Sequence, residues 1–271
     1  MTVLVRRILT AAVLVPLLAA AVLSGSPWPF PLLVGGAVLL CAVEYSAMFF
    51  APRLERTMSA SSALLAYAAG ILLPRPLVLP ATLLCAGLAA GSCLGGGGSG
   101  REKRRAAALA ALGALYLGAV PAAWVWTVRL PDGRYWVLLG LAAIAAGDTA
   151  AYFTGKAFGR RPLAPRVSPN KTVEGALGGL AASLLAGIGI AAALLPAVSR
   201  GEAALASVVL GATGQAGDLF ESWLKRKAGV KDSGSILPGH GGMFDRADAA
   251  IAAGPVLYLA AVLSGMAGGS A

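Results

Sequence analysis

Acidic, basic and hydroxyl side chains recur at helical spacing in one stretch of the sequence, residues 217–226. Asp218, Glu221, Ser222 and Lys225 stand at relative positions 0, 3, 4 and 7, so they would share one face of a helix. A helix that only packs against lipid would present an apolar face there. The polar stripe therefore indicates a helix that lines a polar cavity, and an interhelical ladder of salt bridges is the structural alternative.

A second polar segment carries charged and titratable side chains around a glycine-rich turn. These residues are Lys231, Asp232, His240, Asp245, Arg246 and Asp248. Glycines such as Gly241 and Gly242 let the backbone approach a ligand closely and offer N–H groups to an anion. Asp245 and Asp248 are three residues apart, and paired carboxylates of this kind suit Mg²⁺ held together with phosphates. Carboxylates, cations and a glycine-rich turn together predict phosphoryl or nucleotidyl transfer, and a structural role is the alternative for His240.

A third polar segment precedes these two. Asp148 shares one face of a predicted helix with Tyr152 and Gly155. Ser168 and the proline after it predict the start of a turn. In the following loop Lys171, Ser168 and Thr172 offer an amine and hydroxyls to phosphate groups. Glu174 falls in the first turn of the next predicted helix, where the helix dipole favours a negative charge. Alone, this segment points to anion binding with little specificity.

The elements that position these residues are predicted to be membrane-spanning helices. Hydrophobic residues make up 58% of the chain and charged residues 13%, about half of the roughly 25% typical of soluble domains. Mean hydropathy is +0.77. Apolar runs of spanning length lie near residues 8–24, 30–50, 58–73, 77–94, 106–127, 136–154, 174–196, 203–224 and 247–268. The alternating ten-residue segments of a membrane barrel are absent, so we expect an all-α polytopic membrane protein of about nine spans, with eight as the alternative.

The distribution of basic residues predicts the orientation of these spans. Eighteen of the 22 lysine and arginine residues fall on one side, and only Arg75, Arg129, Arg134 and Arg200 fall on the other. The positive-inside rule then puts the N-terminus and the motif loops in the cytoplasm and the C-terminus outside. The net charge of +10 is explained by this topology and by anionic lipid, so no nucleic-acid partner is expected. The site should therefore lie at the cytoplasmic membrane face.

The sequence also suggests a division into two parts. Residues 1–105 hold the first four spans and a basic linker, whereas residues 106–271 hold the last five spans and all three polar segments.

The polar segments resemble the motifs of one enzyme family. Residues 222–226, 231–232 and 238–248 closely resemble the signature of the phosphatidate cytidylyltransferases, and residues 168–175 resemble the second motif of that family. The resemblance covers roughly residues 140–255. It departs from the family pattern at Asn170, Val173 and Ala247, and the missing cation at position 170 would weaken a contact with nucleotide phosphate.

The resemblance implies a reaction and a set of site residues. CTP and phosphatidic acid would give CDP-diacylglycerol and pyrophosphate with Mg²⁺, in a bacterial-type inner membrane, and the family further implies a homodimer. A second cation is left open. The implied metal ligands are Asp218, Asp245 and Asp248. The other implied catalytic residues are Lys225, Arg226, Lys231, Asp232, His240 and Arg246. The implied substrate-binding residues are Asp148, Ser168, Lys171, Thr172, Glu174, Ser222, Gly241 and Gly242.

Two other functions are weighed against this one. A CTP-dependent lipid kinase, acting on a polyprenol or phytol, would use a similar architecture but transfer the γ-phosphoryl group. A cation-coupled transporter would place its carboxylates near mid-bilayer and often show an internal repeat, whereas the carboxylates here crowd one side and no convincing repeat is visible.

Overall fold

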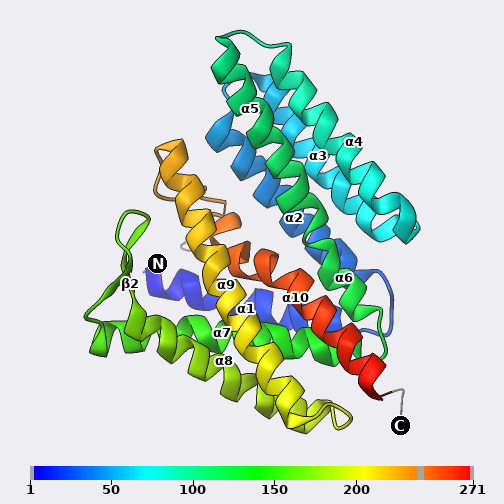
Figure 1. The fold of residues 1–271 in the computed structure, drawn as a ribbon, viewed down its shortest axis with the longest axis vertical. Coiled ribbons are helices and arrows are strands. Elements are labelled where there is room, and N and C mark those ends of the chain that lie inside the picture. The colour runs from blue at the N-terminus through cyan, green and yellow to red at the C-terminus, as the bar shows by residue number, and fades with distance from the viewer. Residues whose placement is uncertain (1–2, 237–240, 269–271) are drawn as a thin grey trace. The chain divides into compact units, whose positions relative to one another are not determined.

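The protein is almost entirely helical in the computed structural model, which describes residues 3–236 and 241–268 (Figure 1). The helices are α1 (Val3–Leu23), α2 (Pro29–Phe49), α3 (Arg53–Leu72), α4 (Arg75–Leu94), α5 (Gly100–Gly113), the π-helix η1 (Ala114–Ala119), α6 (Ala122–Val128), α7 (Gly133–Phe158), α8 (Val173–Leu194), α9 (Arg200–Ala228) and α10 (Phe244–Gly268). Two short strands, β1 (Pro162–Ala164) and β2 (Ser168–Thr172), lie between α7 and α8. The all-α polytopic membrane architecture predicted from composition is confirmed.

Every predicted apolar run overlaps a helix. In the described part of the chain, seven helical segments are long and apolar enough to cross a membrane. They are α2, α4, the continuous segment from α5 to α6, α7, α8, α9 and α10. The first turns of α3 carry Arg53, Glu55 and Arg56, which lower its hydropathy, and Ala12–Leu23 forms a shorter apolar helix. A total of nine spans stays a prediction.

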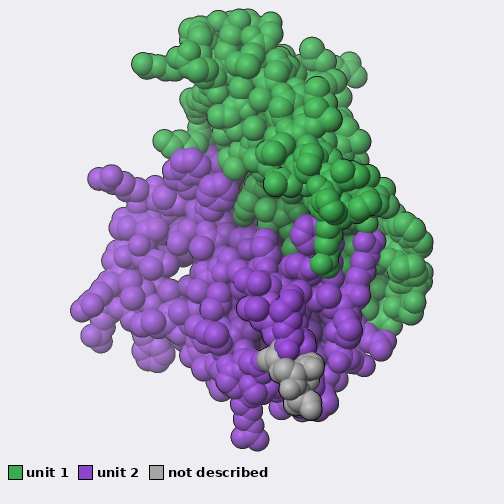
Figure 2. Space-filling view, turned by 45° about the vertical axis from the view of Figure 1, so that its right-hand side comes forward, with its two compact units in different colours: residues 1–125, 227–247 green, residues 126–226, 248–271 purple. Residues whose placement is uncertain are grey.

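The chain folds into two compact units that are not consecutive halves of the sequence (Figure 2). Unit 1 comprises Met1–Val125 and Lys227–Ala247, and unit 2 comprises Trp126–Arg226 and Asp248–Ala271. The division at residue 105 that the sequence suggests stays a prediction.

In unit 1, α2 to α5 pack against one another (Figure 1). The buried hydroxyl of Tyr45 on α2 donates to the carbonyl of Leu109 on α5 at 2.8 Å, and Tyr67 on α3 donates to the carbonyl of Pro31 on α2 at 2.7 Å. These bonds satisfy phenol groups inside an apolar bundle, where an unpaired hydroxyl would be costly. These bonds therefore connect α2 with α5 and with α3.

In unit 2, α7 and α8 pack extensively against each other, and β1 and β2 form an antiparallel hairpin between them. Ser183 of α8 donates to the carbonyl of Ala143 on α7 at 2.8 Å. Gln215 of α9 donates to the carbonyl of Ala176 on α8 at 3.1 Å. These bonds tie α9, which carries the polar stripe, to the α7–α8 pair.

The prediction that a turn begins at Ser168 was wrong. Ser168 begins β2, and the turn lies just before it, closed by the N–H of Val167, which donates to the carbonyl of Ala164 at 3.1 Å. Pro165 is the second residue of this turn, where its fixed φ is favourable. The hairpin therefore places Lys171 near the end of an extended strand instead of in an open loop.

Candidate active site

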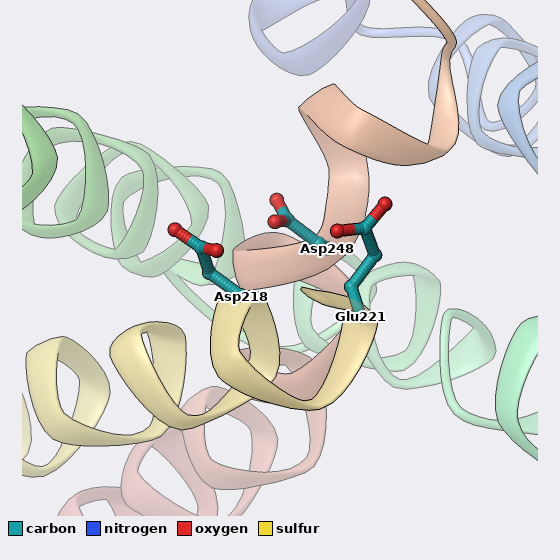
Figure 3. Close-up of side chains that lie close together, drawn as sticks. All are labelled: Asp218, Glu221 and Asp248. Atoms are coloured by element: carbon teal, nitrogen blue, oxygen red, sulfur yellow. The ribbon is translucent and has the colours of Figure 1, made fainter. Parts of the chain in front are cut away.

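Three carboxylates from two helices come together in unit 2 (Figure 3). Asp218 and Glu221 project from α9 and Asp248 projects from α10, and one oxygen from each lies within 4.8 Å of the others. Glu221 is 1% exposed and Asp248 8% exposed, whereas Asp218 is partly accessible. We call these three residues the acidic cluster. It is a group of oxygen ligands that could hold a metal ion.

A glycine brings the two helices close enough to form the acidic cluster. A Cβ atom at Gly217 would lie 2.6 Å from the carbonyl oxygen of Asp248 and 2.6 Å from the Cβ of Ala252. No larger residue fits there without displacing α10. Gly217 therefore sets the separation between the backbone next to Asp218 and the backbone of Asp248.

Two lysines pair with carboxylates of the cluster. Lys171, from β2, lies 2.5 Å from Oδ2 of Asp218, and Lys225 lies 2.7 Å from Oε2 of Glu221 one helical turn away. The hydroxyl of Ser222 donates to Oδ1 of Asp218 at 3.4 Å. The stripe predicted on α9 is thus a real contact network that receives one lysine from outside the helix.

A fourth carboxylate faces this network from α7. Asp148 is near enough for its charge to act on Asp218 and Lys171, and Asp248 is within range of the same three charges. The sequence-predicted residues Asp148, Lys171, Asp218 and Asp248 are therefore brought together by four different elements. Carboxylates outnumber lysines in this group, which favours the binding of a cation beside them.

Two predicted residues at the start of α8, Thr172 and Glu174, bind neighbouring backbone groups. Thr172 caps α8 by accepting a hydrogen bond from the N–H of Gly175 at 3.1 Å. Glu174 accepts hydrogen bonds from the backbone N–H groups of Arg160 and Arg161 at 3.0 and 3.2 Å. Substrate contact by Thr172 and Glu174 stays a prediction.

Arg226 binds the turn of the hairpin. Its Nε donates to the carbonyl of Val167 at 3.4 Å, one residue before Ser168. This bond connects the end of α9 with the hairpin. Roles for Arg226 and Ser168 toward a substrate stay predictions.

The remaining predicted residues lie in unit 1, except that His240 is outside the described residues. Lys231 and Asp232 are exposed, and Arg246 lies in the first turn of α10. Gly241 has a positive φ of 83°, a conformation that favours glycine. Asp245 accepts hydrogen bonds from the N–H of Gly242 at 3.0 Å and from the N–H of Ser233 at 3.2 Å. Asp245 as a metal ligand stays a prediction.

Sequence reasoning missed two acidic residues that the structure makes prominent. Glu221 was recognised on the polar stripe but not as a partner of Asp218 and Asp248. Glu44 was not singled out, although it is the only charged residue in the apolar run 30–50 and an ionisable residue within a span is itself a signal. Its carboxylate accepts hydrogen bonds from the N–H groups of Met243 and Phe244 at the start of α10.

Comparison with known proteins assigns the family. Residues 5–264, nearly the whole chain, match the model of the cytidylyltransferase family. The chain belongs to the cytidylyltransferase family. The family identified from the motifs is thereby confirmed.

Several curated members of the cytidylyltransferase family resemble this chain. It is 46% identical over 129 residues to a phosphatidate cytidylyltransferase of Brucella suis, an alignment that covers 48% of this chain and 47% of the relative. It is 46% identical over 127 residues to that of Bacillus subtilis, covering 46% and 47%, and 42% identical over 143 residues to that of Synechocystis, covering 53% and 48%. The chain thus spans about half the length of the curated relatives it matches.

Replacement of Gly217 by alanine should destabilise this cytidylyltransferase-family chain, because the added methyl group meets the backbone of α10. We expect a loss of about 1–3 kcal/mol, typical of overpacking, measured as the free energy of unfolding in detergent. Gly214→Ala is the matched control, since its methyl group would lie 3.5 Å from the nearest atom, an ordinary contact. Both variants gain the same helix propensity. Equal stability of the two variants would contradict this packing argument.

Proposed function

We propose that this chain is a phosphatidate cytidylyltransferase, which transfers CMP from CTP to phosphatidic acid and releases pyrophosphate. The single observation that carries the proposal is the acidic cluster next to Lys171, in a chain of the cytidylyltransferase family. Carboxylates that hold a divalent ion and lysines that hold phosphates are the groups that nucleotidyl transfer needs. The names of the relatives support this choice of substrates.

The acidic cluster fits Mg²⁺ by the chemistry of its donors. Mg²⁺ prefers oxygen ligands at about 2.0–2.1 Å, so ligands on opposite sides of the ion are roughly 4.2 Å apart. The donor oxygens of Asp218, Glu221 and Asp248 lie within 4.8 Å of one another, which is close to this spacing. We assign these three residues to the ion, whereas the sequence assigned Asp218, Asp245 and Asp248. Mg²⁺ bound there would neutralise charge on the triphosphate and on the leaving pyrophosphate.

The lysines of the site would bind the phosphates. Lys171 and Lys225 each already contact a carboxylate of the cluster, so each amine can reach a phosphate that binds beside those carboxylates. Their charge opposes the repulsion between two polyanionic substrates and the charge that builds up on the leaving group. Lys171 enters from the hairpin and Lys225 from α9, so the two amines can hold different parts of the substrates.

The nucleophile needs little activation by the protein. A phosphate monoester has its second pKa near 6, so most of the phosphatidic acid already carries the second negative charge at neutral pH. The task of the site is therefore to bring together and orient an aqueous triphosphate and a lipid headgroup. A strong general base is not required, which suits a chain with a single histidine.

The position of the site along the helices agrees with a location near one membrane surface. Asp148 and Asp218 lie in the C-terminal halves of α7 and α9, and Asp248 lies within the first two turns of α10. The positive-inside distribution assigns these helix ends to the cytoplasm, where CTP is available. We therefore place the reaction at the cytoplasmic face of an inner membrane, with the N-terminus inside.

Labelled CTP separates this proposal from a lipid kinase. Purified protein given phosphatidic acid, Mg²⁺ and CTP labelled at the α-phosphorus should transfer the label into lipid, because the CMP moiety is transferred. CTP labelled at the γ-phosphorus should leave the lipid unlabelled, and chelation of the divalent cation should stop the transfer. Labelling of lipid from the γ-position alone would establish a kinase instead.

Neutralising the acidic cluster should abolish turnover. Asp218→Asn, Glu221→Gln and Asp248→Asn each remove one charged metal ligand, and we expect kcat to fall by at least about 100-fold. Glu202→Gln is the control on the same helix, because the Glu202 carboxylate accepts from the N–H of Ser199 at the start of α9, and its rate should stay near that of the wild type. Wild-type turnover of Asp218→Asn or Asp248→Asn would refute the metal assignment.

Removal of the lysine on the hairpin should mainly affect the nucleotide. Lys171→Ala loses a charged contact, and we expect the KM for CTP to rise about tenfold or more, with a smaller change in the KM for phosphatidic acid. Lys103→Ala, which changes a lysine on α5 in unit 1, is the control. An unchanged KM for CTP in Lys171→Ala would remove this residue from the nucleotide site.

A further inference from the structure

A buried carboxylate in unit 1 is bound by the segment that precedes α10. Glu44 of α2 is 3% exposed. Its Oε1 accepts a hydrogen bond from the N–H of Met243 at 2.9 Å, and its Oε2 accepts hydrogen bonds from the N–H of Phe244 at 2.9 Å and the hydroxyl of Ser233 at 3.1 Å. We call the described residues 233–236 and 241–244 the motif loop. Glu44 thus contacts both ends of the motif loop.

These contacts replace the usual cap of a helix. The first N–H groups of a helix have no partner within the helix, and a nearby Ser, Thr, Asp or Asn normally accepts from them. At α10 the acceptor for Met243 and Phe244 comes instead from another helix, 199 and 200 residues away in the sequence. The positive end of the helix dipole favours the negative charge of Glu44 there. The bond therefore fixes where α10 begins relative to α2.

Two glycines of the motif loop, Gly234 and Gly242, are explained by the same carboxylate. A Cβ atom at Gly234 would lie 2.6 Å from Oε1 of Glu44, and one at Gly242 would lie 2.6 Å from Oε2. Glycine at both positions lets the backbone pass directly against Glu44. From the sequence alone, the glycines near position 240 indicated close approach to a ligand, whereas Gly242 approaches a side chain of the protein itself.

Asp245 is oriented by the same loop. Ser233 donates from its hydroxyl to Glu44 and from its N–H to Asp245 at 3.2 Å, and Gly242 donates from its N–H to Asp245 at 3.0 Å. Two N–H groups that bind the Asp245 carboxylate therefore lie on a backbone that Glu44 anchors. Displacement of the loop from Glu44 would move both of these N–H donors away from Asp245.

We propose that Glu44 is a positioning residue of the reaction: through the motif loop it fixes the start of α10 and the orientation of Asp245. This inference rests on the proposed function, because only a reaction that uses the start of α10 needs that orientation. Glu44 touches no substrate and acts only through the loop. The side-chain amide introduced by Glu44→Gln has one acceptor oxygen, so it cannot satisfy the three donors.

The test compares Glu44→Gln with Tyr45→Phe. Tyr45→Phe removes a buried hydrogen bond of the neighbouring residue on α2, to Leu109, but leaves Glu44 and its donors intact. In Glu44→Gln we expect kcat to fall about 10- to 100-fold, the range seen for residues that orient catalytic groups, and amide hydrogen exchange in residues 241–247 to become at least about tenfold faster. In Tyr45→Phe, exchange in these residues and kcat should stay within about threefold of the wild type, although the melting temperature falls.

Two further variants disturb the contact from the loop side. Ser233→Ala removes one donor, and Gly234→Ala places a methyl group against Oε1. Both should accelerate amide exchange in residues 241–247 and lower kcat. The variant with the faster exchange should have the lower kcat. Wild-type exchange and kcat in Glu44→Gln, or in both loop variants, would overturn the proposal, as would an equal loss of kcat in Tyr45→Phe. If the wild-type protein transfers no CMP, the proposed function fails, whereas the exchange comparison still decides whether Glu44 anchors the loop.

Discussion

The structure depends on how carboxylates are compensated inside an apolar helical protein. An isolated charge buried away from water is strongly unfavourable, so each buried carboxylate needs a cation or several hydrogen-bond donors. In unit 2, Lys225 lies beside the buried Glu221, and Lys171 contributes its charge next to Asp218 and Asp248. In unit 1, Glu44 is compensated by backbone N–H groups and a hydroxyl. These contacts determine which helices must meet, and the lipid-facing residues have no comparable requirement.

The helical architecture could be predicted from the sequence because the bilayer allows few solutions. Backbone groups in lipid must be paired within the segment or within a closed barrel, so long apolar runs become helices, and every run of this chain overlaps one. The hairpin before α8 could not be predicted in the same way. Its strands are short and rich in polar residues and proline, and the position of its turn is decided by Pro165 and the bond from Val167 to Ala164.

Part of the candidate site could also be predicted from the sequence. Asp148, Lys171, Asp218 and Asp248 were chosen by residue type, helical spacing and family motifs, and the structure brings their charges together. Glu44 was not predicted to have a role because its partners lie 189 to 200 residues further along the chain. No local sequence pattern indicates a contact over that separation. Glu221 was not predicted as a metal ligand because the spacing of residues along α9 does not reveal which of its carboxylates lie close to α10.

The long separation between Glu44 and the motif loop has a consequence for the order of assembly. Ribosomes add about 5–20 residues per second, so roughly 10–40 s pass between the synthesis of α2 and the synthesis of its donors some 200 residues later. In that interval the carboxylate must stay hydrated or take up a proton, because its final partners do not yet exist. Glu44 can therefore form its final hydrogen bonds only after residues 233–244 have been synthesised, so the contact between α2 and the start of α10 forms late in assembly.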